Sequence, residues 1–212
     1  MLNHLFTHRL MPAVTFNREE DVLPVAEAIL QGGLNVMEVT FRTEIAFKAI
    51  KMIRKRFPEL QVGAGTLLSS EQIDLALNAG AVFGVAPGLS ASVVKYAAER
   101  SFPFIPGIIT PSELENALAL GCGVLKLFPC DLGGGISLIR ALQAPYAHTG
   151  VRFIPMGGIH LSNLHEYTDL DIVLAAGGSW IAPSEMIAQK RFDQILENVK
   201  RSVAITGAKN TK

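Results

Sequence analysis

The regular alternation of short apolar runs with longer amphipathic segments constrains the fold of this chain more than any other feature. The apolar runs predict strands at 10–16, 36–41, 62–67, 82–86, 102–105, 124–129, 152–156 and 172–175. The intervening segments predict helices at 19–31, 43–57, 70–80, 90–100, 110–121, from the glycines 133–135 to 144, 161–167 and 185–204. Continuous strand–helix alternation implies parallel strands joined by right-handed crossovers. Eight such units predict an α/β protein with the (β/α)8 TIM-barrel fold.

The competing architecture is an open, doubly wound sheet. That fold would place a G-x-G-x-x-G loop after an early strand, and the segment 63–66, which reads GAGT, does not supply one. No Ser-rich or Pro-rich linker interrupts the pattern, so we expect one domain over residues 1–212. Within it, residues 1–9 form a short N-terminal segment and 207–212 a frayed tail.

Charge and residue usage exclude several classes of partner. The 19 basic and 19 acidic side chains cancel, which gives no electrostatic case for binding nucleic acid or a membrane surface. No apolar run approaches the roughly 20 residues that span a bilayer. Cys122 and Cys130 flank one strand and cannot easily pair, so a reduced, cytoplasmic protein is expected. The five histidines lack ligand spacing, so a structural zinc site is not expected.

One lysine stands in an apolar strand. Lys126 lies in the stretch VLKLFP, where Val, Leu and Phe surround it. A buried ammonium is costly unless it is paired or neutral, and desolvation lowers the pKa of an amine. A neutral lysine is a nucleophile that can form a Schiff base with a carbonyl. The alternative at this point is a salt-bridged or snorkelling lysine at a strand end.

Polar residues also occupy one face of the strand at 36–41. Because side chains alternate faces along a strand, Glu38, Thr40 and Arg42 share one face and leave the other face apolar. The apolar set must pack under the helices, which places the polar set inside the barrel. These residues then serve a ligand or one another. The alternative is a Glu38–Arg42 ion pair that plugs the barrel.

The ends of other strands carry weaker signals. Thr66 ends its strand, and Gly63 and Gly65 leave room for close approach. Pairs of glycines follow the last two predicted strands, at 157–158 and at 177–178, and Ser179 comes next. Active sites of this fold lie at the C-terminal ends of the strands, and the ends of strands seven and eight are its usual phosphate site. Plain turn chemistry is the alternative for each pair.

Taken in chain order, these motifs resemble the bacterial KDPG/KHG aldolases, which act on 2-keto-3-deoxy-6-phosphogluconate and 4-hydroxy-2-oxoglutarate. The resemblance extends from about residue 10 to about residue 182. It is carried by the segments 38–43 (EVTFRT), 62–66 (VGAGT), 87–88 (PG), 106–107 (PG), 126–129 (KLFP), 157–159 (GGI) and 177–180 (GGSW).

The resemblance implies a cytoplasmic class I aldolase, a homotrimer that uses no metal or cofactor. It implies that Lys126 forms the Schiff base with pyruvate and that Glu38 shuttles protons. It places the pyruvate carboxylate on Arg42, Thr66 and Pro87. The phosphate-binding residues that it implies are Gly157, Gly158, Gly177, Gly178 and Ser179.

The expected reaction is cleavage of the phosphogluconate substrate to pyruvate and glyceraldehyde 3-phosphate, with the hydroxyoxoglutarate as a second substrate. Two alternatives stay open: an aldolase for the galactonate epimer, and a phosphosugar-binding barrel without catalysis. The chain departs from the family at Met156, where a small hydroxyl residue is usual. The segment 1–9 is also short, long enough only for a stub of the helix that often plugs the barrel bottom.

Overall fold

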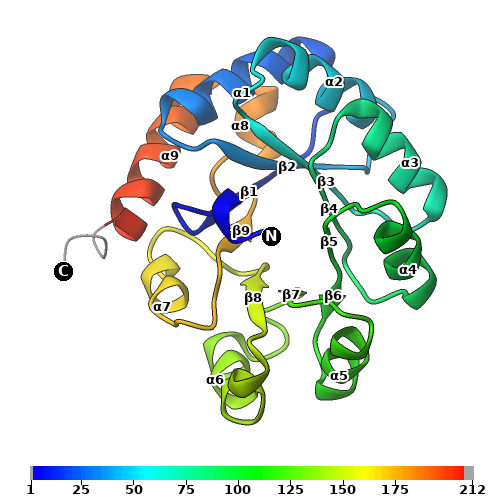
Figure 1. Cartoon of the computed structure of the whole chain (residues 1–212). Helices are drawn as coiled ribbons and strands as arrows, with labels where there is room; N and C mark the ends of the chain where they lie inside the picture. The colour runs from blue at the N-terminus through cyan, green and yellow to red at the C-terminus, as the bar shows by residue number, and fades with distance from the viewer. Residues whose placement is uncertain (1, 208–212) are drawn as a thin grey trace.

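Parallel strands form a ring that is surrounded by helices in the computed structural model, which describes residues 2–207 (Figure 1). The strands are β1 (Leu10–Val14), β2 (Val36–Thr40), β3 (Gln61–Gly65), β4 (Phe83–Val85), β5 (Phe104–Ile105), β6 (Gly107–Ile108), β7 (Val124–Leu127), β8 (Arg152–Pro155) and β9 (Ala176–Gly178). The helices are α1 (Val22–Gln31), α2 (Ala46–Arg56), α3 (Ser70–Ala79), α4 (Ala91–Glu99), α5 (Pro111–Ala119), α6 (Gly135–Tyr146), α7 (Leu164–Thr168), α8 (Ser184–Ala188) and α9 (Phe192–Gly207).

The strand order closes into a barrel. One sheet runs β5-β4-β3-β2-β1-β9 and the other runs β6-β7-β8, and every pairing is parallel. Bridges from Phe153 to Val173 and from Met156 to Gly177 join β8 to the last strand. β5 and β6 share one position in the ring, because Pro106 between them has no N–H to donate. The predicted (β/α)8 barrel is therefore confirmed.

Several predicted boundaries are wrong. The last strand is β9, at Ala176–Gly178, whereas the sequence predicted 172–175. The apolar residues 172–175 are not a strand, because only Val173 among them forms a bridge, to Phe153. Pairing with β1 begins at Ala176. The predicted helix 185–204 is two helices, α8 and α9, because Lys190 between them has a φ of 56°. Of the predicted tail 207–212, Gly207 ends α9 and the remainder lies outside the described residues.

Other helices are also shorter than their predicted spans. The helix predicted at 43–57 begins only with α2 at Ala46, and that predicted at 161–167 is reduced to α7 at 164–168. The N-terminal stub forms a single 3-10 turn over Asn3–Leu5. No helix in the described range is long and apolar enough to cross a membrane.

Alternate strand positions divide the core into two layers. On β2, Val36 belongs to the cluster inside the barrel, whereas Met37 and Val39 pack in the layer between sheet and helices. The N-terminal segment completes the inner layer: Leu5 and Phe6 are buried in it, and the Phe6 ring meets the Phe83 ring edge-on at 5.9 Å. The short stub therefore still fills one end of the barrel with apolar side chains.

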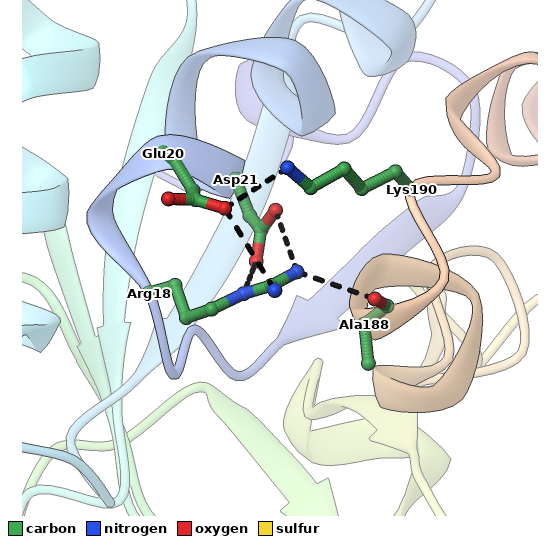
Figure 2. A network of polar contacts seen from close by, with 5 residues as sticks. All are labelled: Arg18, Glu20, Asp21, Ala188 and Lys190. Carbon is green, nitrogen blue, oxygen red and sulfur yellow. Dashed lines mark hydrogen bonds and ion pairs between the residues drawn. The ribbon is translucent and has the colours of Figure 1, made fainter.

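A polar network joins the start of α1 to the turn between α8 and α9 (Figure 2). Arg18 donates from Nε to the buried Asp21 carboxylate at 2.9 Å and from Nη2 to the carbonyl of Ala188 at 3.2 Å. Lys190 pairs with Glu20 at 3.0 Å beside it. Because Asp21 is only 2% exposed, Arg18 neutralises a charge that burial would otherwise penalise. The network fixes the segment after β9 against the segment after β1.

Candidate active site

A cavity of about 220 Å³ opens among the C-terminal ends of β1, β2, β7, β8 and β9. Glu38 and Arg42 line it from β2, and Lys126 lines it from β7. Gly157 and Gly158 after β8, together with Gly178 and Ser179 at the end of β9, form another part of its wall. A larger cavity of about 630 Å³ lies elsewhere, beside Leu2 and Arg152, and contains none of these residues.

Glu38 is a buried carboxylate with an incomplete set of hydrogen-bond partners. It is 1% exposed, and its Oε2 atom has no hydrogen-bond partner among residues 2–207. Gly65 on the neighbouring strand makes space for it, because the position that a Cβ would take at Gly65 lies 1.7 Å from Oε1 of Glu38. Burial raises the pKa of Glu38, while the positive charges of Lys126 and Arg42 oppose the rise. A carboxyl group with a raised pKa is suited to general acid–base work.

Lys126 is a buried amine in the same cavity. It is 3% exposed, and its Nζ lies 4.8 Å from the centre of the Phe128 ring. Burial lowers its pKa and the Arg42 charge lowers it further, whereas Glu38 raises it. A snorkelling lysine does not fit this burial of the whole residue. Neither Lys126 nor Arg42 forms an ion pair with Glu38 within residues 2–207, so the plug alternative is also wrong.

Arg42 is held at the cavity wall by Thr66. Arg42 Nε donates a hydrogen bond to Thr66 Oγ1 at 3.2 Å. Strict alternation would place Thr66 on the outer face of β3 with Val62 and Ala64, but its φ of 61° breaks the alternation at the strand end. The left-handed conformation brings the hydroxyl to Arg42. The guanidinium then has its remaining N–H groups available for a carboxylate.

Not every predicted residue reaches this cavity. Thr66 does not line the cavity, but its hydroxyl is hydrogen-bonded to Arg42, which does. Pro87 lines a different cavity of about 250 Å³, together with Leu67 and Leu68. Gly177 lies beneath Met156, whose Cε occupies the space where a Cβ at Gly177 would stand. The predicted phosphate set is therefore brought together at Gly157, Gly158, Gly178 and Ser179, without Gly177 in the cavity wall.

The glycine turn after β8 has positive φ at two successive residues. Gly157 has a φ of 103° and Gly158 a φ of 69°, so a side chain at either position would be strained. Successive N–H groups in such a turn can form a concave donor site. Asp131 packs against this turn from the loop after β7, because a Cβ at Gly158 would lie 2.8 Å from its Cγ.

Met156 points into the barrel. It is 3% exposed, belongs to the inner cluster and lines the cavity, so its thioether faces the site rather than the helices. The cavity wall also carries two hydroxyl groups: Thr40 on β2, which alternation had placed inside the barrel, and Thr15 at the end of β1, which sequence reasoning did not assign to the site. Thr15 could have been found from the alternation on its strand, which places Met11, Ala13 and Thr15 on one face.

The segment after β9 is held from behind by α9. Trp180 covers Gly178, because a Cβ there would lie 2.7 Å from the indole ring. The indole Nε1 of Trp180 donates to Ser202 Oγ at 3.2 Å, and Asn198 Nδ2 donates to the carbonyl of Ile181 at 3.2 Å. Sequence reasoning missed Asn198 and Ser202, because an amphipathic helix does not show which polar side chains reach inward.

Two features often used in catalysis are absent from the described range. Within residues 2–207, no three His, Cys, Asp or Glu side chains group closely enough to hold a metal ion. Cys122 and Cys130 are free and buried, and burial together with Asp131 raises the pKa of Cys130 to about 12. A thiol with such a pKa is protonated at neutral pH and is a poor nucleophile.

A parallel barrel with a buried lysine and a buried glutamate in one cavity at the C-terminal ends of its strands has the groups that a Schiff-base aldolase requires. The family model described as "KDPG and KHG aldolase" matches residues 1–198. The chain belongs to the KDPG and KHG aldolase family.

Individual relatives agree with this assignment. The chain is 45% identical to a 2-dehydro-3-deoxy-phosphogluconate aldolase of Treponema pallidum, over 94% of each chain. It is 35% identical to a Legionella pneumophila KDPG aldolase, whose structure captures pyruvate as a covalent carbinolamine; the match covers 94% of this chain and 97% of that one, with a TM-score of 0.90. It is 33% identical to a Zymomonas mobilis relative solved with 3-phosphoglycerate, over 95% and 97%, with a TM-score of 0.85.

Proposed function

We propose that this chain is a class I aldolase that cleaves 2-keto-3-deoxy-6-phosphogluconate to pyruvate and glyceraldehyde 3-phosphate. The hydroxyoxoglutarate, which yields pyruvate and glyoxylate, is the proposed second substrate. The observation that carries the proposal is the burial of Lys126 and Glu38 in one cavity, where burial lowers the pKa of the amine and raises that of the acid. Both shifts favour the neutral forms that imine formation and general acid catalysis require.

The chemistry begins at Lys126. The neutral Nζ adds to the C2 carbonyl of the substrate to give a carbinolamine, and loss of water leaves an iminium ion. Glu38 donates the proton with which the hydroxyl leaves as water. The Glu38 carboxylate then accepts the proton of the C4 hydroxyl while the C3–C4 bond breaks. The bonding electrons move into the iminium, which becomes an enamine, and the acceptor half departs as an aldehyde.

The remaining steps restore the enzyme. The enamine takes a proton at C3, which gives the imine of pyruvate, and water hydrolyses this imine to pyruvate and the free Lys126 amine. We assign the substrate carboxylate to Arg42, which Thr66 orients. We assign the phosphate to the backbone N–H groups around Gly157, Gly158, Gly178 and Ser179.

Oligomeric state and compartment are proposed on other grounds. The homotrimer rests on the family resemblance, and light scattering coupled to gel filtration tests it. The cytoplasmic assignment is supported by Cys122 and Cys130, which are both free and buried as expected in a reducing compartment.

Pyruvate release coupled to lactate dehydrogenase tests the activity directly. The gluconate substrate, its galactonate epimer and the hydroxyoxoglutarate are offered separately to the wild-type protein. Higher kcat/KM for the gluconate substrate than for its epimer supports the proposal. Preference for the epimer would show that the chain is an aldolase for the galactonate substrate. The role of Lys126 would be the same in that case. No pyruvate from any of the three would refute an aldolase with these substrates.

A further inference from the structure

Two threonine hydroxyls form a hydrogen-bonded pair in the cavity wall. Thr15 Oγ1 and Thr40 Oγ1 lie 2.7 Å apart, Thr40 is 2% exposed, and both side chains line the cavity that holds Glu38 and Lys126. The proposed mechanism uses neither hydroxyl. A hydroxyl pair beside the proposed catalytic groups, which no step of the mechanism uses, requires an explanation.

The position of Thr15 follows from the strand register. β1 pairs with β2 on one side, where Ala13 lies opposite Glu38, and with β9 on the other, where Pro12 lies opposite Gly178. Thr15 therefore stands on the strand between the wall that carries Glu38 and the wall that carries Gly178. If the carbonyl end of the substrate lies at Glu38 and its phosphate at Gly178, the middle carbons of the substrate lie beside β1.

The pair offers both kinds of hydrogen bond. One hydroxyl donates its proton to the other, which leaves the second hydroxyl free to donate and the lone pairs of the first free to accept. The wall at the end of β8 has no equivalent, because the Met156 thioether is a weak acceptor and no donor. A substrate hydroxyl in the middle of the acceptor half therefore has a hydrogen-bond partner at β1 and none at Met156.

We propose that Thr15, held by Thr40, is a specificity-determining residue that binds the hydroxyl carried by the carbon between the reacting aldehyde carbon and the phosphorylated carbon. The ligand class is the 2-hydroxy-3-phosphate three-carbon unit. This inference rests on the proposed function, since it assigns the middle of the same acceptor site. It also predicts that acceptors without this hydroxyl gain nothing from Thr15.

Binding of two unreactive acceptor analogues tests the proposal without turnover. Calorimetric titration compares 3-phosphoglycerate with 3-phosphooxypropanoate, which has the same carboxylate and phosphate but lacks the hydroxyl. We expect the wild-type protein to bind 3-phosphoglycerate about 2- to 13-fold more tightly, the range for one net hydrogen bond. Thr15→Val, an isosteric change without the hydroxyl, reduces the ratio of the two dissociation constants towards one. Thr15→Ser retains the preference.

Each outcome decides the proposal. A ratio near one in the wild-type protein, or an unchanged ratio in Thr15→Val, overturns it, and so does failure of both analogues to bind. Equal weakening of both analogues in Thr15→Val overturns it too, because that result indicates a structural role. Thermal melting of each variant reports on folding, and the hydroxyl-dependent ratio is insensitive to a general loss of stability. Trapping of pyruvate with borohydride, measured in parallel, tests the proposed function separately.

Discussion

Two glycines on the inner face of β3 give the sharpest test of how Glu38 is positioned. Gly65 faces the Glu38 carboxylate, and a Cβ at this position would lie 1.7 Å from Oε1. In Gly65→Ala the carboxylate must retreat by roughly 1.5 Å to regain van der Waals contact. Displacement of about 1 Å can cost a reaction on the order of 10²-fold. We therefore expect kcat to fall about 100-fold, which corresponds to about 2.7 kcal/mol of activation free energy.

Gly63 supplies the matched control. It lies two residues earlier on the same face, and a Cβ there would collide with the Phe83 ring instead of with Glu38. Gly63→Ala overpacks the inner core, so it should lower the free energy of unfolding by about 1–3 kcal/mol. Its folded fraction should retain most of the wild-type kcat. Both variants are measured by pyruvate release and by thermal melting.

The contrast between the two variants decides the reasoning. Gly65→Ala is expected to lose kcat with its fold intact, and Gly63→Ala to lose stability with its chemistry intact. A well-folded Gly65→Ala protein with wild-type kcat would show that the position of the Glu38 carboxylate does not limit the reaction. The role assigned to Glu38 would then be wrong.

Three further predictions concern the same cavity. Glu38→Gln should lower kcat by about 10²-fold or more, because it removes the proton transfer. Arg42→Ala should chiefly raise KM for the substrate, because the substrate carboxylate is bound in ground and transition states alike. Equal kcat losses with unchanged KM in both variants would contradict these roles. The rate of imine formation with saturating pyruvate should rise with pH through the lowered pKa of Lys126. Arg42→Gln removes a positive charge that lowers the pKa of Lys126, so the rise in rate should move to higher pH. Glu38→Gln removes a negative charge that raises the pKa of Lys126, so the rise should move to lower pH. Shifts in the reverse directions would refute the electrostatic account. Met156→Thr should increase phosphogluconate cleavage relative to hydroxyoxoglutarate cleavage by about 2- to 13-fold, the value of one net hydrogen bond, and an unchanged ratio in the folded variant would refute it.

Simple periodicity predicted the inward-facing polar residues of β2 because this strand is regular. Alternation placed Glu38 and Thr40 inside the barrel, and the structure confirms both positions. Lys126 was predicted from an apolar strand with one cation, and it is buried. Their roles in the reaction stay predictions, since position alone does not establish chemistry.

Periodicity failed where the backbone leaves the regular strand. The left-handed φ of Thr66 moves its hydroxyl from the outer face to Arg42, and alternation cannot foresee this. The last strand was misplaced because residues 172–175 are apolar and buried, although β1 pairs with Ala176 onward. Thr15 was overlooked for a different reason: a threonine on a strand is ordinary, and only its partner Thr40 and the cavity distinguish it.

Reduction with borohydride in the presence of pyruvate tests the central claim most directly. The account predicts that mass spectrometry finds the wild-type chain modified by one reduced pyruvate, with the label on the peptide that contains Lys126. Lys126→Ala should carry no label, and a Lys48→Ala control, whose lysine is exposed and pairs with Glu19, should label like the wild type. Equal labelling of Lys126→Ala and the wild-type protein would contradict the assignment of Lys126 as the Schiff-base lysine.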